Sequence, residues 1–156
     1  METDGIFTLQ DSEITIQALS HQIPTLNWDK LNVLILPSDD ENNAFYAGTL
    51  ELLDYFSANF DSGLADIFIL DENYKELTLH SKEFRIGTLL VISVIVPFFV
   101  NLLSGYIYDK LKADANDNIS ITVIVQKKNG SSKSIQYTGK VEKMKQALDA
   151  IEEQAE

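Results

Sequence analysis

The chain contains no cysteine among its 156 residues, and only three prolines and two histidines. Without cysteine there is neither a disulfide framework nor a thiolate metal site, which fits a reducing compartment. The first residues, METDGIFTLQD, are acidic and lack the apolar stretch of a secretory signal peptide. These absences lead us to expect a cytoplasmic protein.

Patterns that carry catalysis are also lacking. His21 and His80 each stand without a second ligand at a metal-binding spacing. There is no GxxxxGK[ST] phosphate loop and no G-x-S-x-G nucleophile elbow; residues 137–140 (YTGK) match only the end of the phosphate-loop pattern. The sequence therefore favours a protein that is not an enzyme and that holds no cofactor.

The net negative charge of the chain comes from its first half. Residues 1–86 hold 16 Asp and Glu against 4 Lys and Arg, a net charge of −12, whereas residues 87–156 hold 8 of each kind. No cluster of basic residues indicates a face for nucleic acid, which needs phosphate neutralisation. An acidic half attracts a basic protein partner, although a solvated acidic surface that favours solubility explains the same composition.

Three consecutive acids follow the first strongly apolar segment. Residues 32–37 (NVLILP) predict a strand buried on both faces. Asp39, Asp40 and Glu41 come directly after it and precede a helical pattern that we expect to run from about residue 42 to residue 60. Acids at this place satisfy free N–H groups and face the positive end of the helix dipole.

The same acids have two further interpretations. They follow the carboxyl end of a strand, where ligands bind in open α/β sheets. Together with Asp71, Asp39 and Asp40 form a candidate site for a hard cation. As candidate partner-binding residues on the acidic half we name Asp39, Asp40, Glu41 and Asp54.

The longest uncharged stretch runs for 23 residues, over residues 86–108. We favour one kinked helix, residues 87–112, buried by the rest of a small domain. The 48 residues that follow predict only a hairpin and a helix, too little for a core of their own. Two alternatives stay open. Residues 86–108 are long enough to span a bilayer beneath an acidic soluble head. Alternatively, Thr88–Val96 form a strand and Pro97 begins a helix.

The remaining patterns complete an α+β fold. Asn129-Gly130 marks a hairpin turn, with Ile135 and Tyr137 pointing inward on the second strand and Gly139 ending it. Val141, Met144, Leu148 and Ile151 form the apolar stripe of a closing helix. Expected strands cover residues 13–18, 32–37, 66–71, 76–80, 119–126 and 133–138. We predict a single domain over residues 1–156, in which a mixed sheet packs against an amphipathic helix, a long uncharged buried helix and a C-terminal hairpin and helix.

The C-terminal part of the chain resembles known proteins in layout. An uncharged segment ending in GYIYDKL is followed by the strands ITVIVQKKNG and SIQYTGKVE and by an amphipathic helix. Over residues 86–153 this order is similar to small uncharacterised bacterial proteins and to effector-associated components of bacterial conflict systems. The resemblance implies a non-catalytic adaptor and supplies no functional residues. We therefore expect an intracellular protein-interaction module, with a single-span membrane protein as the alternative.

Overall fold

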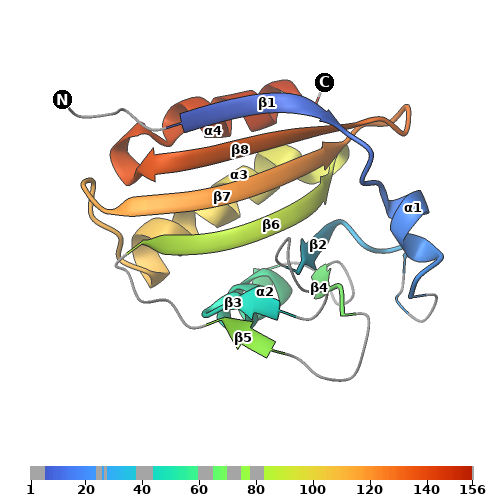
Figure 1. Ribbon diagram of the computed structural model, residues 1–156, viewed down its shortest axis with the longest axis horizontal. Coiled ribbons are helices and arrows are strands. Elements are labelled where there is room, and N and C mark those ends of the chain that lie inside the picture. The colour runs from blue at the N-terminus through green and yellow to red at the C-terminus, as the bar shows by residue number, and fades with distance from the viewer. Residues whose placement is uncertain are drawn as a thin grey trace.

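Six strands form the main sheet of the protein, seen in a computed structural model (Figure 1). The structure describes residues 6–23, 26, 28–37, 44–59, 65–69, 75–77 and 83–155. In sheet order the strands are β1 (Ile6–Ser12), β8 (Ser132–Lys140), β7 (Asn118–Gln126), β6 (Phe84–Ile92), β2 (Val33–Leu36) and β4 (Ala65–Ile67). A separate two-stranded sheet joins β3 (Ala44–Tyr46) to β5 (Lys75–Leu77).

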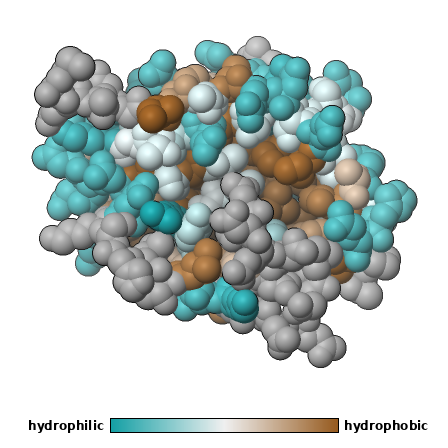
Figure 2. Space-filling view, in the orientation of Figure 1, coloured by the Kyte–Doolittle hydropathy of each residue, from teal (hydrophilic) through white to brown (hydrophobic). Residues whose placement is uncertain are grey.

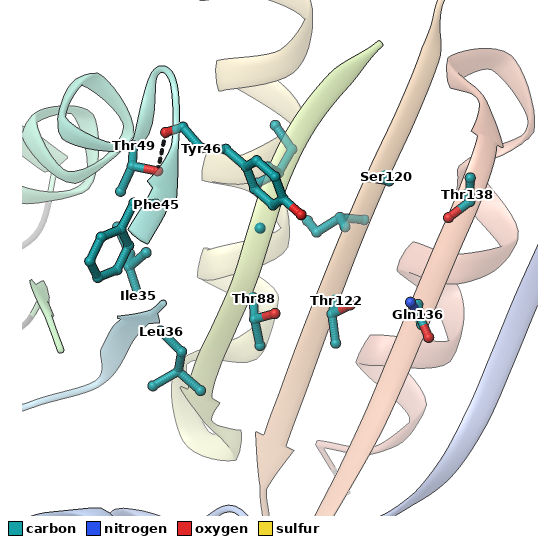
Figure 3. Close-up of a pocket in the computed structure, with 13 residues that line it drawn as sticks. Ile35, Leu36, Phe45, Tyr46, Thr49, Thr88, Ser120, Thr122, Gln136 and Thr138 are labelled. Atoms are coloured by element: carbon teal, nitrogen blue, oxygen red, sulfur yellow. Dashed lines mark hydrogen bonds between the residues drawn. The ribbon is translucent and has the colours of Figure 1, made fainter. Parts of the chain in front are cut away.

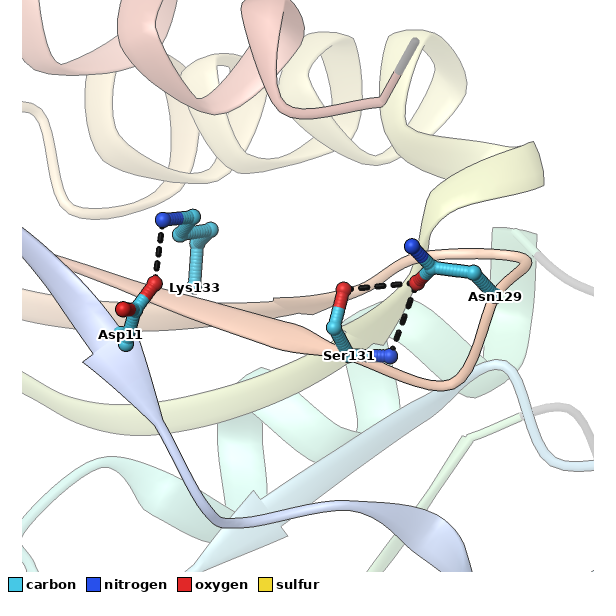
Figure 4. A network of polar contacts seen from close by, with 4 residues as sticks. All are labelled: Asp11, Asn129, Ser131 and Lys133. Atoms are coloured by element: carbon cyan, nitrogen blue, oxygen red, sulfur yellow. Dashed lines mark hydrogen bonds and ion pairs between the residues drawn. The ribbon is translucent and has the colours of Figure 1, made fainter.

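The main sheet is mixed, as predicted. β8 pairs antiparallel with both β1 and β7, whereas β6 and β7 run parallel. Antiparallel β7 and β8 are joined at Asn129 and Gly130, and Gly130 has the positive φ of 90° that such a turn requires. The side chain of Asn129 accepts hydrogen bonds from the backbone N–H and the hydroxyl of Ser131 (Figure 4). The α+β class and the hairpin are therefore confirmed.

The uncharged run is divided between a strand and a helix, so the expectation of one continuous helix over residues 87–112 is wrong. β6 ends at Ile92, a 3₁₀ turn covers Ser93–Ile95, and α3 covers Val96–Gly105. A π-helical turn, Tyr106–Lys110, follows directly. Branched side chains in the first part favour an extended backbone, and Pro97 lies in the first turn of α3, where its missing N–H costs no hydrogen bond.

No helix among the described residues has the length and apolar character needed to cross a membrane.

One face of the main sheet is covered by α3 and by α4 (Lys145–Glu153), which lie behind the strands in Figure 1. The predicted alternation of β7 is confirmed, because Ile119, Ile121, Val123 and Val125 all lie in the core on this side. Ile135 and Tyr137 of β8 are buried with them, as expected. A 3₁₀ turn, Val141–Lys143, precedes α4. Buried residues of the closing segment are Val141, Met144, Ala147, Ala150 and Ile151, with Leu148 partly buried.

A smaller core lies on the opposite face, beneath the segment that contains α1 (Ile16–Ser20). Its buried members are Leu31, Leu34, Leu36, Phe68, Leu90 and Ile124. Gln126 attaches α1 to the sheet: its Oε1 accepts a hydrogen bond from the Ile16 backbone N–H at 2.6 Å, and its Nε2 donates to Gln17 Oε1 at 2.8 Å. The sheet is thus covered on both faces near the end of β7.

Several element boundaries differ from the prediction. Residues 13–18 are not a strand, because Thr15 caps α1 by accepting a hydrogen bond from Ala18 N–H, and the strand is β1 instead. The helix expected at residues 42–60 is shorter: α2 covers Thr49–Asn59, and β3 precedes it. Gly139 does not end its strand, since it pairs with Ile119 inside β8.

Strands were expected at residues 66–71 and 76–80. β4 confirms a strand at residues 66 and 67, but Phe68 and Ile69 are described and lie outside it, so this strand ends earlier than expected. β5 confirms residues 76 and 77, and residues 70–71 and 78–80 lie outside the described residues.

Candidate functional site

Most of the residues singled out for binding fall outside the described part of the chain. These are Asp39, Asp40 and Glu41 of the partner-binding set and Asp71 of the cation set. Within the described ranges, no three His, Asp or Glu side chains are grouped as a metal ion requires. The cation site stays a prediction. Asp54 is described, and it lies exposed on α2.

Asp54 lines an open groove of about 820 Å³ between α2 and the π-helical turn after α3. Small-molecule and side-chain binding sites typically have volumes of about 300–1,000 Å³. From α2 come Glu51, Asp54 and Tyr55; from the other side come Tyr106 and Lys110. The groove therefore joins the acidic half of the chain to the charge-balanced half.

Two carboxylates lie along the α2 wall. Glu51 and Asp54 are three residues apart, a spacing that places side chains on the same side of a helix. Both side chains are exposed, and Glu51 stands in the first turn of α2. Lys110, also exposed, is on the opposite wall. The groove thus has an acidic side and a basic side, with the acidic side carrying more charge.

Two tyrosine rings meet in the groove. The ring centroids of Tyr55 and Tyr106 are 5.3 Å apart, with an angle of 57° between the ring planes. Tyr106 is buried, with 5% of its surface exposed, and its hydroxyl lies 3.5 Å from the carbonyl oxygen of Gly48. Burial raises the pKa of the Tyr106 phenol, and the nearby Glu51 carboxylate raises it further. The phenol is therefore neutral at ordinary pH.

Gly105 makes room for this arrangement. A Cβ atom at position 105 would lie 2.8 Å from the Tyr55 hydroxyl oxygen, closer than real Cβ contacts allow. Glycine inside a helix costs about 1 kcal/mol relative to alanine. At the end of α3, glycine allows the Tyr55 side chain to lie close against the helix. A larger residue at position 105 would displace this ring of the tyrosine pair.

The π-helical turn sets the other wall. The Leu111 backbone N–H donates to the Tyr106 carbonyl at 2.9 Å, the five-residue spacing of a π turn. Such turns occur often at functional positions because they displace side chains from the regular helical spacing. Here the turn carries both Tyr106 and Lys110. No sequence pattern indicated it, since the helix was expected to continue regularly to residue 112.

A second hollow lies on the open face of the sheet (Figure 3). Gly87 lines it, with a φ of 92° beside a bulge in β6, and the Tyr46 ring lies at an ordinary van der Waals distance, 3.7 Å, from where a Cβ atom of that residue would be. The Arg85 guanidinium carbon lies 5.6 Å from the centre of that ring. The polar side chains that line the hollow are Tyr46, Thr49, Thr88, Ser120, Thr122, Gln136 and Thr138.

This second hollow does not have the size of a ligand site. Its volume is about 120 Å³, well below the roughly 300 Å³ at which small-molecule sites begin. Figure 2, in the orientation of Figure 1, shows pale residues of intermediate hydropathy over these strands, with hydrophilic residues at the margins. Neutral polar side chains are what one solvated face of a sheet carries. The groove beside α2 is therefore the candidate functional site.

Comparison with known proteins adds no assignment: no family model, no curated protein and no solved structure matches this chain. The function has to be inferred from the groove itself. Its carboxylates attract a positively charged group, and a cation is stabilised over the face of a tyrosine ring such as that of Tyr55, which is partly exposed.

Proposed function

We propose that this protein is a non-enzymatic, cytoplasmic interaction module, and that the groove between α2 and the π-helical turn binds a basic side chain of a partner protein. The observation that carries the proposal is the combination, in one groove of about 820 Å³, of the Glu51 and Asp54 carboxylates with the Tyr55–Tyr106 ring pair. Carboxylates alone are typical of any solvated helix; the adjoining rings distinguish this place.

Each part of the groove contributes to binding a cation. Carboxylates near the surface attract a positive group over a distance set by ionic strength, about 10 Å at 0.1 M salt. A lysine or arginine over a tyrosine ring gains a further ~0.5–1 kcal/mol at an exposed site and ~2 kcal/mol when water is excluded. Affinity for the partner should therefore fall with added salt but persist in part, because the contact with the rings is less sensitive to screening.

Lys110 on the opposite wall restricts which partner segments the groove can bind. A partner segment with positive charge alone would meet it and be repelled. A segment that places a carbonyl or carboxylate oxygen next to its basic side chain satisfies both walls at once.

The test compares capture of partners by three forms of the tagged protein. In the first variant, Glu51→Gln and Asp54→Asn remove both groove carboxylates. In the control, Asp149→Asn and Glu152→Gln remove two exposed carboxylates of α4 that have the same spacing. We expect the groove variant to lose a partner that wild type and the control retain, and the partner, once purified, to bind wild type at least tenfold more tightly than the groove variant.

Equal binding by the groove variant and the control would refute the assignment to the groove. A Tyr55→Leu variant separates the two contributions. Loss of the ring should weaken binding at high salt, where the carboxylates are screened, more than it weakens binding at low salt. An unchanged salt dependence would remove the ring pair from the proposal.

A further inference from the structure

β1 is an edge strand with nothing beside its outer side among the described residues. It pairs with β8 over its whole length, from Ile6 opposite Thr138 to Ser12 opposite Ser132, without a bulge. Its sequence, IFTLQDS, contains neither proline nor lysine, the residues that commonly protect an edge. The outer N–H and C=O groups of β1 are thus available to another strand.

Two of the exposed side chains of β1 are large and apolar. Ile6 is 68% exposed and Leu9 is 46% exposed. Phe7 packs against the main core, whereas Leu9 belongs to neither core cluster. Two of the seven large hydrophobic side chains that the structure leaves exposed therefore lie on this one strand.

β1 is also almost neutral in a chain whose net charge is −12. Its one charged residue is Asp11, and the Asp11 carboxylate is paired with the Lys133 ammonium on β8 (Figure 4). Two copies of so acidic a chain repel one another where acidic surfaces meet, and β1 adds little to that repulsion. The charge distribution favours β1 as a contact between copies.

We propose that β1 pairs antiparallel with β1 of a second copy, about a two-fold axis through Leu9, so that the two six-stranded sheets become continuous. In this register each copy places Leu9 opposite the partner's Leu9, Thr8 opposite the partner's Gln10, Phe7 opposite the partner's Asp11, and Ile6 opposite the partner's Ser12. The pairing is closed, since each copy uses its free edge once.

The strand is self-complementary in this register. Phe7 and Leu9 share the face that the helices cover, because they pair across β8 with the core residues Tyr137 and Ile135. The two copies of Leu9 and of Phe7 therefore form one apolar group. On the other face, Thr8 meets the partner's Gln10 and Ile6 meets the partner's Ser12. No two like charges are opposite one another, because the partner's Phe7 faces Asp11.

The test uses charges at the two-fold axis. Wild type should show a concentration-dependent rise in mass from 17.5 kDa toward twice that value in sedimentation experiments. Leu9→Lys or Leu9→Asp alone places like charges opposite one another and should give a monomer at every concentration. An equal mixture of the two variants places Lys opposite Asp and should restore the dimer.

Leu50→Lys on α2 is the matched control, because Leu50 is 45% exposed, about as much as Leu9, but lies away from β1. It should dimerise as wild type does, and all variants should keep the wild-type circular dichroism spectrum. A monomeric wild type throughout the dilution series would overturn the proposal. So would self-association of either Leu9 variant alone, or failure of the mixture to associate.

Discussion

Residues 84–155 supply the three central strands of the main sheet, whereas residues 6–77 supply the strands on both flanks. β6, β7 and β8 have nine residues each; β2 has four and β4 has three. The charge is divided in the same way, with −12 over residues 1–86 and zero over residues 87–156. The three longest strands thus come from the neutral part, and the shorter strands, β1 with seven residues among them, come from the acidic part.

This difference separates what stabilises the protein from what it presents to others. Buried branched residues fill the long central strands, and they account for much of the core. The acidic part contributes the Glu51 and Asp54 wall of the groove and the free edge of β1. Both surfaces adjoin the neutral part of the chain: the groove lies beside the turn that follows α3, and β1 pairs with β8. Substitutions where the two parts meet therefore test this comparison.

The largest effect is expected at the centre of the sheet. Leu89 of β6 is fully buried and lies opposite Ile35 of β2, so it contacts both parts. Leu89→Ala should lower the free energy of unfolding by about 2–5 kcal/mol, since it removes buried methyl groups and leaves a cavity. Val94→Ala, at a side chain that is mostly exposed, should change it by less than about 0.5 kcal/mol. Urea denaturation measures the free energy of unfolding of both variants. Equal losses in the two variants would contradict the placement of Leu89 in the core.

A smaller loss is expected where α1 meets the sheet. Gln126→Ala removes the acceptor of the Ile16 N–H and the donor to Gln17, and leaves a partly buried backbone N–H without its partner. We expect a loss of about 1–3 kcal/mol, with faster hydrogen exchange at Ile16. Gln136→Ala is the control: Gln136 is exposed on the same face, and its loss should cost less than about 0.5 kcal/mol. Unchanged exchange at Ile16 would contradict the attachment.

The division of residues 86–108 into a strand and a helix shows which parts of the fold the sequence predicts and which it does not. Mean hydropathy over residues 86–108 does not distinguish a buried strand followed by a helix from a single helix. The branched residues up to Val96 indicate a strand, and the position of Pro97 indicates the start of a helix. Because no glycine or asparagine turn separates Val96 from Pro97, the sequence favoured a single helix instead. Ser93, which is buried, begins the 3₁₀ turn that makes the change of direction.

Local hydrogen bonds decided the other differences. Residues 13–18 alternate like a strand, but the Thr15 hydroxyl accepts a bond from Ala18 N–H and begins a helix. Side chains of this kind compete with extended structure wherever they reach a nearby N–H group. Strand patterns that alternate over nine residues, as in β7, are not altered by a single such contact, and the hairpin was predicted correctly.

Of the groove, sequence indicated only Asp54. Tyr55 and Tyr106 are on different helical segments, and their contact depends on how α2 packs against α3. Gly105 leaves space for the Tyr55 hydroxyl. Neither feature has a local sequence pattern, because both arise from tertiary packing.

A ring contact couples the two parts of the chain. Phe56 of α2 and Phe99 of α3 are fully buried and stacked, with centroids 5.7 Å apart. In a double-mutant cycle of Phe56→Leu and Phe99→Leu, we expect a coupling energy of roughly 0.5–1.5 kcal/mol beyond the two single losses. Thermal or urea unfolding of the four proteins measures it. Strictly additive losses would mean that the two parts are joined through the strands and not through these rings.

The smallest effect is expected at the Asp11–Lys133 ion pair between β1 and β8. The hydrogen bond from the Lys133 ammonium, and then its charge, hold the pKa of the Asp11 carboxyl below its ordinary value of 3.8. Stability from this pair is therefore present above pH 3.8 and is lost as the pH falls through the lower pKa of the folded state. Because Asp11 is exposed, the stabilisation is small.

The melting temperature of Asp11→Asn should lie slightly below that of wild type near pH ~7 and coincide with it near pH ~2. Glu13→Gln, which removes an exposed carboxylate just beyond β1, controls for net charge. A difference between Asp11→Asn and wild type that persisted at the lower pH would assign the effect to something other than this ion pair.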